Sequence, residues 1–201
     1  MQRVDSRILS RIYGRGRGCV VTPGEFLDLG SRQAVDLALH RLTKRGTLRR
    51  LARGLYDYPR THATMGLLSP GPDAVARALA GKDSIRLQPS GAYAANLLGL
   101  STQVPAKVVY LTDGPSRTVK IGNQEIHLRH TTPRNMGPAG RISGLVIQAL
   151  RHLGRGNVDD SIIDILRRRL TEGDKRQLLK DISHAPAWVG QCLRAVSGED
   201  R

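Results

Sequence analysis

The sequence predicts an α+β protein, in which a small helical module that ends in a basic hairpin precedes a mixed α/β domain with a helical C-terminal part. Cap and turn signals divide residues 1–60 into short helices and strands. Beyond residue 141, apolar side chains recur at helical spacing. Between these parts, short apolar runs alternate with turn residues, which is typical of strands.

The module begins with a helix predicted over residues 3–13, whose apolar residues share one face: Val4, Ile8, Leu9 and Ile12. The Gly-Arg loop 14–18 ends it, and a short strand follows over 19–21. Thr22 is a cap for a second helix, with Pro23 at its first position and Glu25 three residues after the cap. Gly30 closes that helix.

A third helix is predicted from its cap Ser31 to about Arg45, and Gly46 ends it. A hairpin follows, with strands over 48–51 and 55–58 joined by a turn at 52–54. Helix, short strand, two helices and a two-stranded hairpin are the order of a winged helix-turn-helix. We therefore expect a DNA-binding domain over residues 1–60.

Residues 61–72, rich in Thr, Ser, Pro and Gly, are predicted to be a linker with some order of its own, and residues 73–201 a second, α+β domain. Helices are expected near 73–80 and 91–98, and strands near 85–87, 108–111, 118–121 and 125–130. The last two strands flank Gly122-Asn123, a signal for a two-residue hairpin. Three apolar stripes then predict helices after residue 141.

Charge points to a polyanionic partner. Lys and Arg number 32 against 17 Asp and Glu, so the net charge is +15. Residues 1–60 and 77–155 each carry +8, whereas residues 156–201 are neutral. Nucleic acid is the usual partner of such a protein, and an anionic membrane surface is the alternative. We expect the neutral tail to serve in packing or protein contact.

Membrane and export signals are missing from the sequence. No apolar run approaches the roughly 18 residues of a spanning helix, and no apolar stretch of a signal peptide follows the N-terminus. Cys19 and Cys192 lie in apolar runs and are expected to be buried free thiols. We therefore expect a soluble, cytoplasmic protein associated with the nucleoid and not with a membrane.

The third helix carries the predicted base-reading face. Its buried side holds Val35, Ala38, Leu39 and Leu42, so the opposite side presents four residues: Gln33, Leu37, His40 and Lys44. A glutamine amide can bond adenine, a leucine can touch a thymine methyl group, and a lysine can reach phosphate. An ordinary solvated helix remains the alternative.

The hairpin and the Gly-Arg loop add cations. A basic hairpin tip can reach the DNA backbone or a narrow minor groove, and the loop arginines can bind phosphate or form a plain solvated turn. The predicted DNA contacts are Arg15, Arg17, Ser31, Arg32, Gln33, Leu37, His40, Arg41, Lys44, Arg49, Arg50 and Arg53.

Several runs resemble AbiEi-type antitoxins, the transcriptional-regulator halves of type IV toxin–antitoxin systems. They are ALHRL at 38–42, GTLRRL at 46–51, RGLYDYP at 53–59 and SGAYAANLLGL at 90–100, followed by Val104-Pro105. The similarity covers roughly residues 1–130. It implies a bacterial repressor that binds inverted repeats in its own promoter. It also implies that the protein counters a nucleotidyltransferase toxin without a stable complex, and that residues 73–201 are antitoxin-like.

Candidate catalytic and metal sites are weak. His127 and His130 fall on opposite faces of a predicted strand, which is poor metal geometry. Asp113, Lys120 and Glu125 lack the spacing of a nuclease site, and Ser90 and Ser143 lack a base partner in the sequence pattern. The acidic cluster Asp159, Asp160 and Asp164 suits a helix start. We expect no enzyme, no cofactor and no metal; the alternatives are a non-specific nucleic-acid-binding or chromosome-organising protein and, more remotely, a DNA-regulated enzyme.

Overall fold

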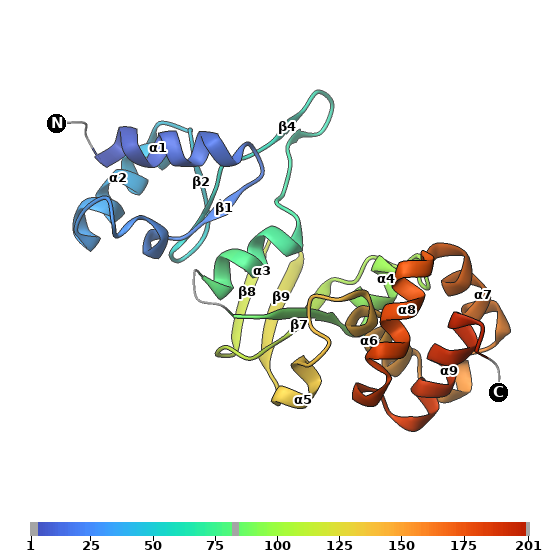
Figure 1. Ribbon diagram of the computed structural model, residues 1–201. Helices are drawn as coiled ribbons and strands as arrows, with labels where there is room; N and C mark the ends of the chain where they lie inside the picture. Colours follow the sequence, from blue (N-terminus) through green and yellow to red (C-terminus); the bar gives the residue numbers. More distant parts are fainter. Residues whose placement is uncertain (1–3, 82–84, 200–201) are drawn as a thin grey trace. The chain divides into compact units, whose positions relative to one another are not determined.

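The computed structural model describes residues 4–81 and 85–199 of the chain (Figure 1). They form a mixed α+β fold, as predicted, in two compact units. The first unit is Met1–Ile85 with Val119–Ile126, and the second is Arg86–Thr118 with His127–Arg201. The first unit thus takes in the predicted linker and the helix after it, and the domain bounds inferred from sequence stay a prediction.

The first unit opens with three helical segments and three strands. In order they are α1 (Val4–Arg15), β1 (Val20–Val21), the 3₁₀ helix η1 (Pro23–Phe26), α2 (Arg32–Lys44), β2 (Arg49–Ala52) and β3 (Leu55–Asp57). The strands form an antiparallel sheet in the order β1-β3-β2. Gly54 turns the β2–β3 hairpin with a φ of 70°, a value that glycine adopts without strain.

Caps and turns explain most of these bounds. The Ser31 hydroxyl accepts the Ala34 N–H at 3.3 Å and so starts α2 at the predicted cap, and Gly46, with a φ of 73°, follows its end. The predicted start of the first helix at Arg3 lies outside the described residues.

The second predicted helix is wrong in type, because residues 23–26 form a 3₁₀ helix and residues 27–29 a turn. The Glu25 N–H bonds the Thr22 carbonyl and the Leu29 N–H bonds the Phe26 carbonyl, both closing tight three-residue turns. The span between Pro23 and Gly30 is too short to nucleate a stable α-helix.

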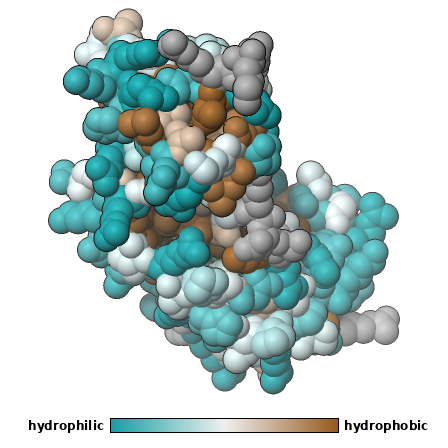
Figure 2. Space-filling view, turned by 90° about the vertical axis from the view of Figure 1, so that its left-hand side faces the viewer, coloured by the Kyte–Doolittle hydropathy of each residue, from teal (hydrophilic) through white to brown (hydrophobic). Residues whose placement is uncertain are grey.

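Apolar side chains from α1, η1 and α2 meet over the sheet to form the core of this module. The fully buried members include Ile8, Ile12, Phe26, Val35, Ala38, Leu39 and Leu42. Figure 2 views the molecule from the side of α1 and α2, where hydrophilic side chains cover much of the visible surface.

Residues 61–81 carry more structure than a linker. A small hairpin of β4 (Thr61–His62) and β5 (Gly66–Leu67) has every residue exposed, and α3 (Pro72–Ala80) follows it. The predicted helix near 73–80 is thereby confirmed.

The second unit combines a sheet with a helical bundle. Residues Val119–Ile126 belong to the first unit, and the second unit holds the rest of a sheet of order β6-β7-β9-β8. The strands of this sheet are β6 (Leu87–Ser90), β7 (Lys107–Thr112), β8 (Arg117–Ile121) and β9 (Gln124–His130). The helices of the second unit are α4 (Gly91–Leu97), α5 (Pro133–Met136), α6 (Ile142–Leu153), η2 (Arg155–Asn157), α7 (Asp160–Arg169), α8 (Glu172–Lys180), η3 (Ile182–His184) and α9 (Ala187–Ser197). The hairpin predicted at Gly122-Asn123 joins β8 to β9, whereas the strand predicted near 85–87 begins later, as β6.

The three predicted apolar stripes of the C-terminal part meet in one core. Val146 and Leu150 of α6, Leu166 of α7, and Val189 and Leu193 of α9 are all fully buried. The neutral tail therefore packs its apolar residues within its own unit. Cys192 packs against this core, and both it and Cys19 are half-buried free thiols.

Asp181 ties α6 to the end of α8. Its carboxylate accepts hydrogen bonds from Ser143, from Gln177 at 2.8 Å and from Arg141 at 2.5 Å. Burial by itself raises the pKa of Asp181, but these hydrogen bonds and the charge of Arg141 bring the pKa below its usual value. The carboxylate is therefore held in its charged form beneath the first turn of α6.

Within the described residues, no helix is both long and apolar enough to span a membrane.

Candidate nucleic-acid interface

One face of α2 is exposed over the whole length of the helix. Gln33, Leu37, His40 and Lys44 are exposed, and the opposite face is buried as the sequence predicted. Leu37 keeps 54 % of its surface accessible, which is unusual for a large apolar side chain in the middle of an amphipathic helix.

The polar residues of this face are free to bind a ligand. The side chains of Gln33, His40 and Lys44 make no hydrogen bond or ion pair in the described part of the chain. A donor–acceptor amide, an imidazole and an ammonium group are thus presented side by side, with Leu37 between them.

Most of the predicted contact arginines, in contrast, hold the module together. Arg41 of α2 donates to both carboxylate oxygens of Asp5 in α1, at 2.5 and 2.9 Å. This hydrogen-bonded pairing lowers the pKa of Asp5 even though burial acts in the opposite direction. Arg41 therefore fixes the α1–α2 packing.

Arg49 has a comparable role in the β2–β3 hairpin. It donates to the two oxygens of Asp57 at 3.1 and 2.7 Å and to the Leu68 carbonyl at 2.7 Å. The Asp57 side chain is only 1 % exposed, so Arg49 supplies the counter-charge of a buried carboxylate. The hydrogen bond with Asp57 raises the pKa of Arg49, which stays charged.

The remaining arginines on the helical side are also partnered. Arg32 pairs with Asp36 one turn along α2 at 2.9 Å, and Arg15 pairs with Glu25 at 2.5 Å. Arg17 donates to the Pro59 carbonyl at 3.0 Å and lies 4.6 Å from the centre of the Tyr58 ring. The Gly-Arg loop is thus anchored to the strand that leaves the hairpin.

The hairpin tip leaves two arginines available. Arg53 is exposed and has no partner among residues 4–81 and 85–199, and it stands beside Gly54 at the turn. The only hydrogen bond of the Arg50 side chain within the same ranges is a long one of 3.4 Å to the Ala52 carbonyl. The tip therefore presents cations that the fold does not use.

Sequence reasoning missed which cations are neutralised. All five acidic residues of the segment 1–60 pair with an arginine, the fifth pair being Arg11 with Asp28 at 2.7 Å. Only Arg32–Asp36 has a spacing that could reveal a pair in the sequence. The others join residues 8 to 36 positions apart.

The residues considered for chemistry elsewhere have structural partners. His127 bonds Thr118 at 3.1 Å and His130 bonds the Gly114 carbonyl at 3.0 Å. Asp113 pairs with Arg86, which lowers the pKa of Asp113. Asp159 caps α7 by accepting the Ile162 N–H at 3.1 Å. In the parts of the chain that the structure describes, no group of His, Cys, Asp and Glu side chains could hold a metal ion.

Comparison with known families adds a classification. A family model described as a family of unknown function, DUF6088, matches residues 7–178. The chain belongs to DUF6088. A search of curated proteins finds no match. The DUF6088 span includes every predicted DNA contact and extends through most of α8, so it covers parts of both compact units.

Proposed function

We propose that this DUF6088 protein binds double-stranded DNA through a winged helix-turn-helix in its first unit, with α2 as the recognition helix and β2–β3 as the wing. The observation that carries the proposal is the exposed face of α2, whose polar side chains lack partners in the described structure. The order α1-β1-η1-α2-β2-β3 and the sheet β1-β3-β2 support it.

The chemistry of this face suits a major groove. Gln33 lies in the first turn of α2, where a recognition helix faces base edges, and its amide can bond adenine through two groups. Leu37 can contact a thymine methyl group. Lys44, in the last turn, is placed to bind phosphate, and Arg53 of the wing can reach the neighbouring backbone.

The paired arginines act by positioning. Arg41 and Arg49 keep α2 and the wing in place, so that the unpaired side chains meet DNA with little reorganisation. Arg32 is different, because its partner Asp36 is half exposed and such a pair is worth less than about 1 kcal/mol. Arg32 can exchange Asp36 for a phosphate.

The resemblance to AbiEi-type antitoxins indicates the biological role. We propose that the protein represses its own toxin–antitoxin operon from promoter inverted repeats, and that it counters a nucleotidyltransferase toxin without forming a stable complex with it. It would then act in the cytoplasm, at the nucleoid.

The test begins with enrichment of a random duplex pool on the full-length protein, together with DNA from upstream of its own gene. We expect an enriched site that binds at least about 10³-fold more tightly than scrambled DNA. Co-expression with the product of a neighbouring nucleotidyltransferase gene tests the antitoxin role, with restored growth as the expected result.

Equal affinity for all duplexes would instead support a non-specific or chromosome-organising protein. The observation that favours this second candidate is the charge of +8 on residues 77–155, which is about half of the net +15 and lies wholly outside the proposed base-reading elements. The ratio of the two affinities decides between the candidates.

A further inference from the structure

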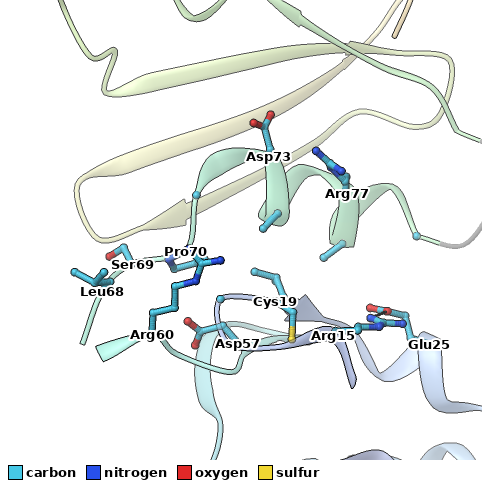
Figure 3. A pocket seen from close by; sticks show the side chains of 16 residues that line it. Arg15, Cys19, Glu25, Asp57, Arg60, Leu68, Ser69, Pro70, Asp73 and Arg77 are labelled. Atoms are coloured by element: carbon cyan, nitrogen blue, oxygen red, sulfur yellow. Dashed lines mark hydrogen bonds and ion pairs between the residues drawn. The ribbon is translucent and has the colours of Figure 1, made fainter. Parts of the chain in front are cut away.

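A pocket of about 550 Å³ lies within the first unit, between the β1–β3 side of its sheet and α3 (Figure 3). Its volume falls within the range of small-molecule sites, roughly 300–1,000 Å³. Arg15 is the only predicted DNA contact among its lining residues, so the pocket is a feature separate from the α2 face.

Three acidic residues line the pocket, and Asp73 points away from Cys19 and Asp57 in Figure 3, while the other two are already compensated. Glu25 accepts from Arg15 and from the Thr22 N–H at 2.7 Å, and both oxygens of Asp57 accept from Arg49. These carboxylates therefore offer little to a cationic ligand.

Apart from Arg15, which pairs with Glu25, two cations line the pocket, Arg60 and Arg77. Arg77 points away from Cys19 and Asp57 in Figure 3, which leaves Arg60 on the side of the sheet. The Arg60 Nε donates to the Arg17 carbonyl at 2.9 Å, and its side chain crosses Gly18, where a Cβ atom would come within 2.6 Å of that Nε. Its two terminal nitrogens have no partner in the described part of the chain. A guanidinium held by its inner nitrogen presents its outer pair for a two-point bond with a carboxylate.

The rest of the lining is largely apolar. Val20 and Leu68 lie on one side, and Ala74 and Ala78 of α3 on the other. In Figure 3 the charged side chains Asp73 and Arg77 point away from Cys19 and Asp57, so α3 turns its small residues toward the sheet. The space between them suits an apolar group.

We propose that this pocket binds a small aromatic carboxylate, with the carboxylate on the terminal nitrogens of Arg60 and the ring between Val20 and the two alanines of α3. The proposal goes beyond DNA binding, because it needs no nucleic acid and uses none of the residues of the α2 face.

Calorimetric titration of the full-length protein, without DNA, tests the proposal. The probes are benzoate, salicylate and indole-3-acetate, with benzamide as a neutral counterpart of benzoate. We expect saturable binding of at least one carboxylate, and binding of its amide at least about tenfold weaker. Arg60→Gln should weaken carboxylate binding by at least about tenfold, and Ala74→Leu should abolish it by filling the pocket. Arg168→Gln, which removes the same charge from an exposed position on α7, should leave the binding unchanged.

Three results would overturn the proposal. They are no saturable binding of any probe up to about 10 mM, equal binding of benzoate and benzamide, or wild-type binding by a folded Arg60→Gln variant. Arg60 is exposed, so this variant should keep the wild-type melting temperature even if Ala74→Leu does not fold. Because the assay contains no DNA, its failure leaves the proposed DNA-binding function standing.

Discussion

The partner of each arginine in the first unit decides what that arginine can do for DNA. If Arg49 turned to a DNA phosphate, the buried carboxylate of Asp57 would lose its counter-charge. Arg53 has no ion pair to break in the described structure, so it can bind phosphate without that cost. Since each acidic residue of the segment 1–60 has one arginine, the excess of +8 there is a count of cations that the fold does not neutralise. Arg3, one of these, lies outside the described residues.

Removal of the Gln33 side chain and removal of the Lys44 side chain should have different effects on DNA affinity. Gln33→Ala should cost roughly 1–3 kcal/mol at the specific site and little on scrambled DNA, because an amide matches one base and mismatches others. Lys44→Ala should weaken binding to both duplexes alike, since an ammonium bonds any phosphate. Titrations of both variants against the two duplexes measure these effects.

An unchanged ratio of specific to scrambled affinity in Gln33→Ala would show that this face of α2 does not read bases. The wing arginines would then carry recognition alone.

Arg49 and Arg53 provide a second pair of contrasting substitutions. Arg49→Ala should lower the free energy of unfolding by about 2–3 kcal/mol, somewhat less than for a fully buried pair because Arg49 itself is partly exposed. Arg53→Ala should leave stability unchanged within about 0.5 kcal/mol and still weaken DNA binding. Urea denaturation and DNA titration of both variants separate a structural from a contacting arginine. Full stability of Arg49→Ala would contradict the role given to its ion pair.

At the level of elements, the start of α6 depends on a carboxylate that comes from the end of α8. Asp181→Asn should destabilise the protein by about 2 kcal/mol near neutral pH, because Arg141 and Ser143 lose a charged acceptor. The pKa of Asp181 is lowered in the folded state, so its contribution is complete above the unfolded pKa of about 3.9 and is lost as the pH falls through the folded pKa.

The stability difference between wild type and Asp181→Asn should therefore shrink as the pH drops below about 4. Urea titrations across that range measure it, with Asp160→Asn at an exposed position as the control. A difference that is constant with pH would exclude the carboxylate charge as the cause.

Elements whose ends are marked by cap or turn residues could be predicted from the sequence. Features that depend on residues distant in the sequence could not. Ser31 specifies a helix start through its side-chain cap, and Gly46 and the Gly122-Asn123 turn specify boundaries through their backbone preferences; the structure has all three. The β4–β5 hairpin was missed, because its strands of two residues each carry no alternating pattern. The exposed face of α2 followed from helical periodicity, but the pairing of Arg41 with Asp5 depends on how α1 packs, which spacing does not reveal.

For the whole molecule, the net charge of +15 predicts a steep salt dependence of DNA binding. If about 6 phosphates are contacted, the slope of log K against log salt should be roughly −5. Affinities measured over a range of monovalent salt concentrations give this slope, and Lys44→Ala should lower it by about 1. A slope near zero would rule out phosphate contacts as the source of affinity.

The C-terminal helices should prove inseparable from the unit that contains them. Deleting residues 156–201 removes Leu166, Val189 and Leu193 from the core that they share with α4 and α6. We expect the second unit to lose its helical circular dichroism and become sensitive to protease. A folded, protease-resistant truncated protein would contradict this. It would instead indicate that residues 156–201 are a separate segment for protein contact.

The composition of the first unit also constrains how the gene can be recombined. Because that unit takes in Val119–Ile126 as well as Met1–Ile85, its coding sequence is interrupted by thirty-odd codons of the other unit. A single crossover can exchange the exposed face of α2 between homologous genes, but it cannot transfer the complete unit. A chimaera joined near residue 85 would take residues 119–126, with the β8–β9 turn, from one parent and the rest of the first unit from the other. Viable recombinants should therefore keep residues 119–126 from the same parent as the N-terminal segment.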